Sequence, residues 1–153
     1  MENIFITMTN LYSLRAINIA LQQKKYSIAV VLSCATISSV IYHLSETKHG
    51  MNSICLKDYT MITLNIDRFF ALCAVGLFAW KYKNILNKSI YKNTNKQIIL
   101  YSVVGMIAQM LSECQHIVNL DLSTEKRLYM ITHPIWHICA FHTAYLLLLD
   151  KNN

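Results

Sequence analysis

Five long apolar stretches, separated by short polar connections, constrain the fold of this chain more than any other feature. The two clearest cover residues 26–44 and 128–149, and the others cover about 3–22, 59–80 and 97–113. Each approaches the roughly 20 residues that a helix needs to cross the hydrocarbon core of a bilayer. Because a spanning segment must satisfy its own backbone hydrogen bonds, the sequence predicts an all-α integral membrane bundle of about five transmembrane helices.

Composition supports the same fold class. The chain of 153 residues is 54% hydrophobic and only 14% charged, whereas soluble domains carry about 25% charged residues. Three glycines and one proline are too few for the many turns of a membrane β-barrel. No internal repeat, linker or secretory signal is evident, so we expect one helical domain over residues 1–153, with its first stretch retained as an anchor.

The charges of the connections predict an orientation. Lysines without any acidic residue occupy the connections after the first and third stretches: Lys24, Lys25, Lys81, Lys83, Lys88, Lys92 and Lys96. The N-terminus and the connections at 45–58 and 114–127 carry most of the acidic residues. Positively charged connections usually face the cytosol, so we expect the N-terminus outside and the C-terminus in the cytosol. The net charge of +6 then reflects topology, and no nucleic-acid partner is expected.

Histidines gather in the outer half of this predicted bundle. His133 and His137 are four residues apart, so their side chains share one helix face within reach of a common ion. This spacing is a common way for a helix to supply two imidazoles to zinc, but two histidines that hydrogen-bond between helices would show it equally. His142 lies about 140° around the helix from His137 and is excluded from the ligand set.

Two other stretches place polar groups at a similar depth. His43 ends the second stretch four residues after Ser39, and Asp67 lies in the outer half of the third. Three neutral imidazoles leave zinc a fourth position for water, which is typical of catalytic sites. The predicted zinc ligands are therefore His43, His133 and His137. Asp67 is the predicted group that orients this water or takes its proton, and Ser39 is the predicted group that stabilises an oxyanion.

Several of these groups allow a second interpretation. Asp58 is an alternative carboxylate, although an acid at a helix start also simply stabilises the helix dipole. The hydroxyls of Ser38 and Ser39 can instead bond to the backbone of their own helix. Pro134 indicates either that the last membrane helix begins near Thr132 or that it kinks there.

The five cysteines show no spacing typical of a zinc ribbon or of a disulfide framework. Cys55 and Cys114 fall in connections on the same predicted side of the membrane. They either form a disulfide with each other or remain free thiols.

Together these motifs carry a resemblance to known membrane proteins. The order S-x-x-x-H, then Asp, then H-x-x-x-H lies within the stretches TNLYSLRAINIALQQKKYS, SSVIYHLSE, DYTMITLNIDRFFALCAVGLFAW and HPIWHICA. The chain resembles the CREST superfamily of membrane hydrolases and receptors, which includes alkaline ceramidases, adiponectin-type receptors and the Per1 family. It looks closest to the TMEM8 branch, to which myomaker belongs.

By this resemblance, His43, His133 and His137 match the zinc ligands, and Asp67 and Ser39 match groups around the zinc-bound water. It implies hydrolysis of a lipid amide or ester bond at a site open to the lumen or the cell exterior. The superfamily has seven helices, whereas this chain has room for five. Loss of one hairpin keeps the last helix in the same direction, but we expect the shorter wall to admit water unless the protein forms a homo-oligomer.

Two functions from different classes follow. The first is a zinc-dependent lipid amidase or esterase in an endomembrane, such as the ER or Golgi, or in the plasma membrane. The alternative is a non-enzymatic membrane protein for fusion, reception or assembly, in which zinc stabilises the fold. A metal-free helical scaffold is a third interpretation.

Overall fold

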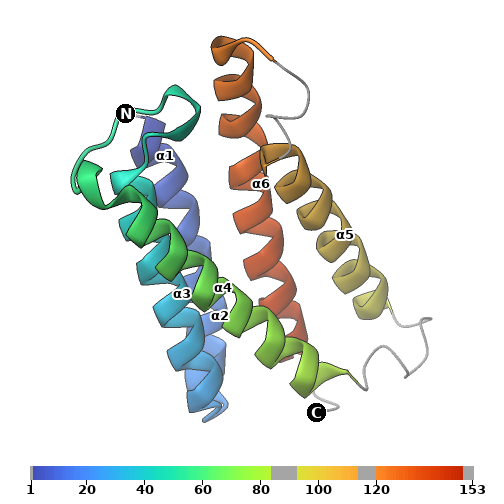
Figure 1. Ribbon diagram of the computed structural model, residues 1–153. Helices are drawn as coiled ribbons and strands as arrows, with labels where there is room; N and C mark the ends of the chain where they lie inside the picture. Colours follow the sequence, from blue (N-terminus) through green and yellow to red (C-terminus); the bar gives the residue numbers. More distant parts are fainter. Residues whose placement is uncertain (1, 84–92, 114–119, 150–153) are drawn as a thin grey trace.

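The computed structural model describes residues 2–83, 93–113 and 120–149 (Figure 1). Every regular element in these ranges is a helix, which confirms the predicted all-α class. The elements are α1 (Glu2–Thr9), the 3-10 turn η1 (Asn10–Tyr12), α2 (Ser13–Gln22), α3 (Tyr26–Ser45), the 3-10 turns η2 (Lys48–Gly50) and η3 (Lys57–Tyr59), α4 (Thr60–Tyr82), α5 (Asn93–Glu113) and α6 (Leu122–Leu149).

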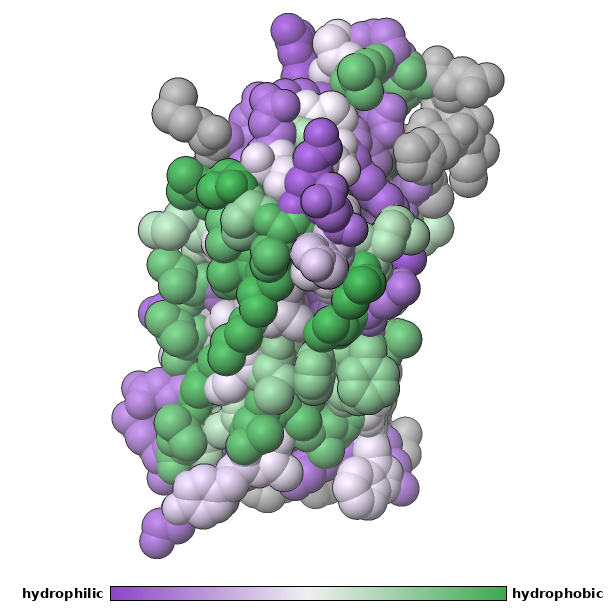
Figure 2. Space-filling view, turned by 60° about the vertical axis from the view of Figure 1, so that its left-hand side comes forward, coloured by the Kyte–Doolittle hydropathy of each residue, from purple (hydrophilic) through white to green (hydrophobic). Residues whose placement is uncertain are grey.

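Three helical segments are both long and apolar enough to cross a membrane. Within the described ranges they are Glu2–Gln22, Tyr26–Ser45 and Lys57–Tyr82, and the first of them runs through α1, η1 and α2. The helices α5 and α6 also have membrane length, with 21 and 28 residues, but they carry more polar side chains. On the face shown in Figure 2, hydrophobic residues form a broad middle band between more hydrophilic ends.

Helix α6 begins earlier than the apolar stretch that we expected to start at residue 128. Its first residue is Leu122, because Asp121 caps the helix start. The Asp121 carboxylate accepts hydrogen bonds from the backbone N–H groups of Ser123 and Thr124, both at 3.1 Å. These hydrogen bonds hold the pKa of Asp121 well below its usual range, and the largest contribution comes from the Ser123 hydroxyl, followed by Thr124.

Pro134 therefore lies well inside α6. The interpretation that the last helix begins near Thr132 is wrong, since α6 is already helical from Leu122 onward. Proline has no backbone N–H, so the carbonyl of Met130 loses its usual intrahelical partner. The missing hydrogen bond would span residues 130–134, which is the turn that carries His133.

The helices form an open row of neighbours. Helix α4 packs on α3, α3 on α1 and α2, α2 on α6, and α6 on α5, so α4 and α5 stand at the two ends of the row. Helix α1 contacts both α3 and α6 and so bridges the two helices that carry the predicted zinc ligands.

The two ends of the molecule differ in charge. The N-terminus, the connection between α3 and α4 and the start of α6 lie together at one end (Figure 1). This acidic end carries Glu2, Asp58, Asp121 and Glu125 together with the bases Lys48, Lys57, Lys126 and Arg127. The opposite end carries Lys24, Lys25, Lys81 and Lys83. Of the two fully described connections between long helices, residues 23–25 lie at the basic end and residues 46–59 at the acidic end.

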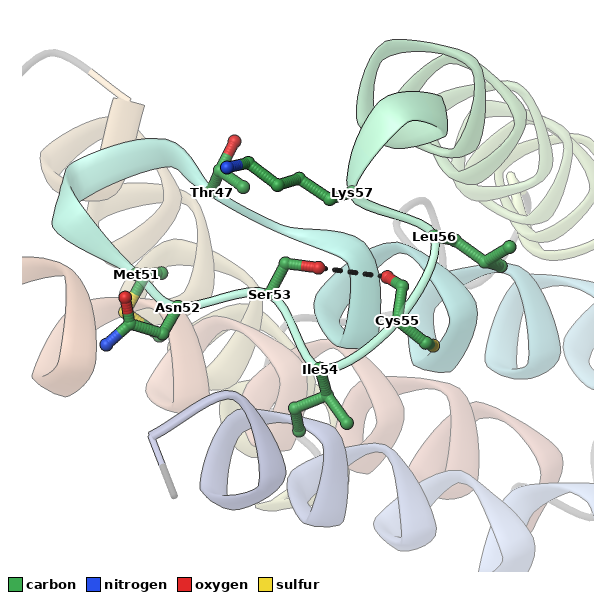
Figure 3. A pocket seen from close by; sticks show the side chains of 8 residues that line it. All are labelled: Thr47, Met51, Asn52, Ser53, Ile54, Cys55, Leu56 and Lys57. Carbon is green, nitrogen blue, oxygen red and sulfur yellow. Dashed lines mark hydrogen bonds between the residues drawn. The ribbon is translucent and has the colours of Figure 1, made fainter.

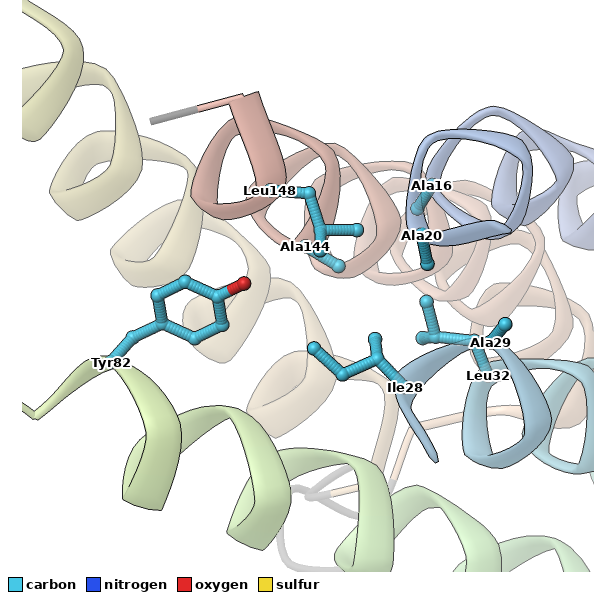
Figure 4. Packing of buried hydrophobic residues seen from close by; sticks show 8 residues of the cluster. All are labelled: Ala16, Ala20, Ile28, Ala29, Leu32, Tyr82, Ala144 and Leu148. Atoms are coloured by element: carbon cyan, nitrogen blue, oxygen red, sulfur yellow. The ribbon is translucent and has the colours of Figure 1, made fainter. Parts of the chain in front are cut away.

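The larger apolar cluster lies toward the basic end and depends on small residues. Ala16 and Ala20 of α2 are fully buried. They pack with side chains from three other helices, namely Ile28, Ala29, Leu32, Tyr82, Ala144 and Leu148 (Figure 4). Small side chains let helix backbones approach closely in a membrane protein. Ala16 and Ala20 therefore set the distance between α2 and its neighbours α3 and α6.

We expect Ala20→Leu to lower the free energy of unfolding by about 1–3 kcal/mol, because a larger side chain overpacks this contact. The measurement is the midpoint of thermal unfolding in detergent micelles. The matched control is Ala79→Leu, which makes the same change at an exposed position of α4. Equal midpoints for the two variants would contradict the close packing of α2.

Candidate metal centre

Three histidines from two helices meet in the interior of the protein. His43 lies near the end of α3, and His133 and His137 lie in α6. One ring nitrogen of each lies within 4.8 Å of the other two, and the Nε2 atoms of His43 and His133 are 3.3 Å apart. All three side chains are buried. The structure thus brings the predicted ligands together as a group that could hold a metal ion.

In each imidazole, the Nδ1 atom contacts a side chain that lies outside the group of three histidines. The Nδ1 contacts are His43 with Glu46 Oε2 at 2.9 Å, His137 with Thr9 Oγ1 at 2.9 Å and His133 with Ser112 Oγ at 3.5 Å. Because Nδ1 is engaged in every ring, Nε2 is the nitrogen that remains for an ion. Outer partners of this kind fix the tautomer and the ring orientation of metal-binding histidines.

Glu46 is the main residue of this centre that sequence reasoning missed. Its place between two apolar stretches predicted an outer-loop acid, but its side chain is fully buried. Besides His43, its carboxylate accepts hydrogen bonds from the hydroxyls of Tyr42 at 2.8 Å and Tyr129 at 2.9 Å. The available indication was the spacing H-x-x-E, because residues three apart lie on the same side of a helix.

Two hydroxyl residues of the centre were also missed. Thr9 is the last residue of α1, and Ser112 is a fully buried residue near the end of α5. Neither has any fixed spacing from the histidines in the sequence. Only the packing of α1 and α5 against α6 brings them to the imidazole rings.

The two predicted catalytic residues lie on different sides of α3. Asp67 of α4 is half-buried, and its Oδ1 accepts a hydrogen bond of 3.4 Å from Ser38. Ser39 is buried but points about 100° away from Ser38 around the helix. Ser38, rather than Ser39, is therefore the hydroxyl beside Asp67, and it also bonds to the backbone carbonyl of Ala35 at 3.1 Å. Among the described residues, Asp67 is outside the group of close ligand atoms.

The remaining candidates lie away from the centre. Asp58 is exposed in η3 just before α4, where its negative charge interacts favourably with the helix dipole. His142 hydrogen-bonds through Nδ1 to the Tyr12 hydroxyl at 3.2 Å, which confirms its exclusion from the ligand set. Cys55 is exposed. Cys114 lies outside the described residues, so both alternatives, a disulfide with Cys55 and two free thiols, stay as predictions.

The connection after α3 is tied to the helix that carries two of the histidines. His49 Nδ1 contacts Glu125 Oε1 at 2.6 Å, and Lys126 Nζ donates to the carbonyl of Gly50 at 3.1 Å. The ring of Tyr129 stacks on His49 at 4.4 Å and on His133 at 4.7 Å. These contacts form a continuous column of rings from the connection to the centre.

A separate hollow of about 370 Å³ lies in this connection (Figure 3). Its lining comprises Thr47 and residues 51–57, and Ser53 Oγ donates to the carbonyl of Cys55 at 3.0 Å within it. No histidine lines it. The hollow is therefore a surface feature of the acidic end and not the entrance to the centre.

The fold and the centre define an all-helical protein in which membrane-length helices surround three buried histidines. The chain belongs to the family described as a protein of unknown function, DUF3522, whose model matches residues 1–112. It is similar to the uncharacterized protein L282 of Acanthamoeba polyphaga mimivirus, with 26% identity over 151 residues that cover 97% of each chain. No solved structure matches the chain. The family match includes His43 and Asp67 but ends before His133 and His137.

We expect Glu46→Gln to weaken the binding of a divalent metal ion by about tenfold to a hundredfold, as outer partners of metal-binding histidines generally do when lost. The amide keeps the shape of the side chain but removes the charge that faces His43. Metal titration of the purified protein measures the change. The control is Glu113→Gln, at an acid that is 40% exposed, and unchanged affinity in Glu46→Gln would contradict the assigned role.

Proposed function

We propose that this protein is a zinc-dependent membrane hydrolase that cleaves an amide or ester bond of a lipid. The observation that carries the proposal is the convergence of three buried imidazoles, in each of which Nδ1 contacts a neighbouring side chain. The resemblance to the CREST superfamily supports the same activity and remains part of the proposal.

The geometry of the centre fits zinc. Imidazole nitrogens bind zinc at about 2.0–2.1 Å in tetrahedral sites, so two of them lie about 3.3 Å apart. The Nε2 atoms of His43 and His133 are separated by 3.3 Å. Three imidazole ligands with a fourth position for water correspond to one of the known types of catalytic zinc site.

Zinc supplies, when bound, a Lewis acid that polarises a carbonyl and acidifies water. The remaining chemistry belongs to the side chains of the chain. Asp67, oriented by Ser38, is the carboxylate available to take a proton from the attacking water. The ring column of His49, Tyr129 and His133, together with the tied connection, screens the centre at the acidic end. Water exclusion of this kind strengthens electrostatic interactions with the reacting groups.

We further propose that all five membrane-length segments span the bilayer, with the basic end in the cytosol. The lysines of the basic end support this orientation. The centre then lies in the leaflet toward the lumen or the cell exterior, because His43 and His133 belong to the parts of α3 and α6 that are near the acidic end. The substrate would be a lipid of that leaflet.

A structural metal is the second candidate. The ligands join α3 to α6 and, through Thr9 and Ser112, to α1 and α5 as well. An ion at this point would connect four helices of an otherwise open row, which is the arrangement expected of a clamp in a non-enzymatic membrane protein. The clamp proposal needs the same metal but no role for Asp67.

We expect the purified wild-type protein to contain about one zinc ion per chain, as a three-imidazole site implies. His137→Ala should reduce this content strongly, because two imidazoles bind zinc far more weakly. His142→Ala is the matched control in the same helix and should keep the metal. Elemental analysis measures the ratio, and a wild-type protein without bound metal would contradict both proposed functions.

We expect the zinc-loaded protein to release fatty acid from at least one member of a panel of ceramides and phospholipids. Asp67→Asn should abolish this release while the zinc content stays unchanged, because the amide cannot accept the proton. The control is Asp58→Asn, at an exposed acid outside the centre. Zinc-loaded protein that is inactive across the panel would favour the structural clamp.

A further inference from the structure

A buried amide close to the centre has no hydrogen-bond partner. Asn10 of η1 is fully buried, and neither its Nδ2 nor its Oδ1 makes a hydrogen bond within the described residues. Most buried polar side chains are paired, since an unpaired one costs free energy. The exception at Asn10 therefore points to a partner that is absent from the folded chain itself.

Two hydrogen bonds fix the register between the first segment and α3. Asn3 Nδ2 donates to the carbonyl of Glu46 at 3.0 Å, and Thr36 Oγ1 donates to Ser13 Oγ at 2.7 Å. The two contacts are ten residues apart in each segment: Asn3 and Ser13 in the first segment, and Glu46 and Thr36 in α3. The two segments are therefore antiparallel, and each has the same helical rise per residue between the two contacts.

This register places Asn10 opposite Ser39. Asn10 follows Asn3 by seven residues, and Ser39 precedes Glu46 by seven, which is two helical turns in each case. Ser39 is buried as well. The unpaired amide of Asn10 therefore faces a buried hydroxyl across the two segments.

The pair also adjoins the metal centre from both sides. Ser39 lies one helical turn before the ligand His43. Asn10 directly follows Thr9, whose hydroxyl contacts Nδ1 of His137 at 2.9 Å. A group held between Asn10 and Ser39 would thus lie within about a helical turn of the three imidazoles.

We propose that Asn10 and Ser39 form a subsite for the carbonyl group of a lipid ester or amide. The Asn10 amide and the Ser39 hydroxyl are neutral hydrogen-bond donors, which suit a neutral carbonyl oxygen in an apolar interior. The Oδ1 atom of Asn10 can accept a hydrogen bond from an amide N–H or hydroxyl of the same lipid. This inference rests on the proposed function and assigns to Asn10 a role that the sequence motifs did not indicate.

The test compares two amphiphiles that differ only in the carbonyl: lauroylglycerol, an ester, and dodecylglycerol, its ether counterpart. Binding is measured on the full chain in maltoside micelles, which contain no carbonyl group. The chain carries Asp67→Asn so that the ester is not consumed. We expect the ester to bind about threefold to tenfold more tightly, which is the value of one net hydrogen bond.

Asn10→Leu in this background should abolish the preference for the ester, and Ser39→Ala should reduce it. The matched control is Asn18→Leu, which makes the same change at an exposed position of the same segment and should keep the preference. Thermal unfolding should show no loss of stability in Asn10→Leu, because the variant removes an unpaired polar group. Should Asn10→Leu not fold, Asn10→Ala replaces it with the same expected result.

Two results would overturn the subsite: equal binding of ester and ether by the parent chain, or an ester preference that survives Asn10→Leu. Neither result bears on turnover, so the hydrolase proposal would stand or fall separately. Conversely, a carbonyl preference that depends on Asn10 in a protein that cleaves no lipid would retain the subsite as a binding site and reject the hydrolase.

Discussion

The whole centre depends on a carboxylate that is completely removed from solvent. Burial of Glu46 is costly unless its oxygens are paired, and the chain pairs them with His43 and two tyrosine hydroxyls from two helices. The same contacts fix the ring of His43 so that its Nε2 faces His133. They also draw the start of the connection after α3 into the interior. One residue therefore links the orientation of an imidazole, a side-chain contact from the end of α3 to α6 and the path of a loop.

The parts of this structure that the sequence predicted are those encoded by local periodicity. Long apolar runs predict helices, and the observed α3 and α4 lie within a few residues of the expected stretches. The spacing of His133 and His137 predicts a shared face, and the place of His43 at a helix end predicts a shared depth. Convergence of the three imidazoles followed from these two regularities, and the structure confirms it.

The rest could not be predicted because it depends on tertiary register and on rotation about a helix axis. Ser38 and Ser39 are adjacent in sequence, yet Ser38 bonds to Asp67 and Ser39 points about 100° away around the helix. Thr9 and Ser112 reach the histidines only because α1 and α5 pack on α6. The early start of α6 was missed since polar residues occupy its first turns, where a capping aspartate rather than an apolar face defines the helix.

The position of α4 at one end of the row makes the surrounding lipid part of the structure. Among the described helices its main neighbour is α3, and of its apolar side chains only Leu64 and Tyr82 are buried. In a membrane, acyl chains rather than protein would cover that surface. The tilt of α4, and with it the position of Asp67 relative to the histidines, would then respond to bilayer thickness, because hydrophobic mismatch is relieved by helix tilt. Membrane composition would in this way adjust the geometry of the centre without any ligand binding to it.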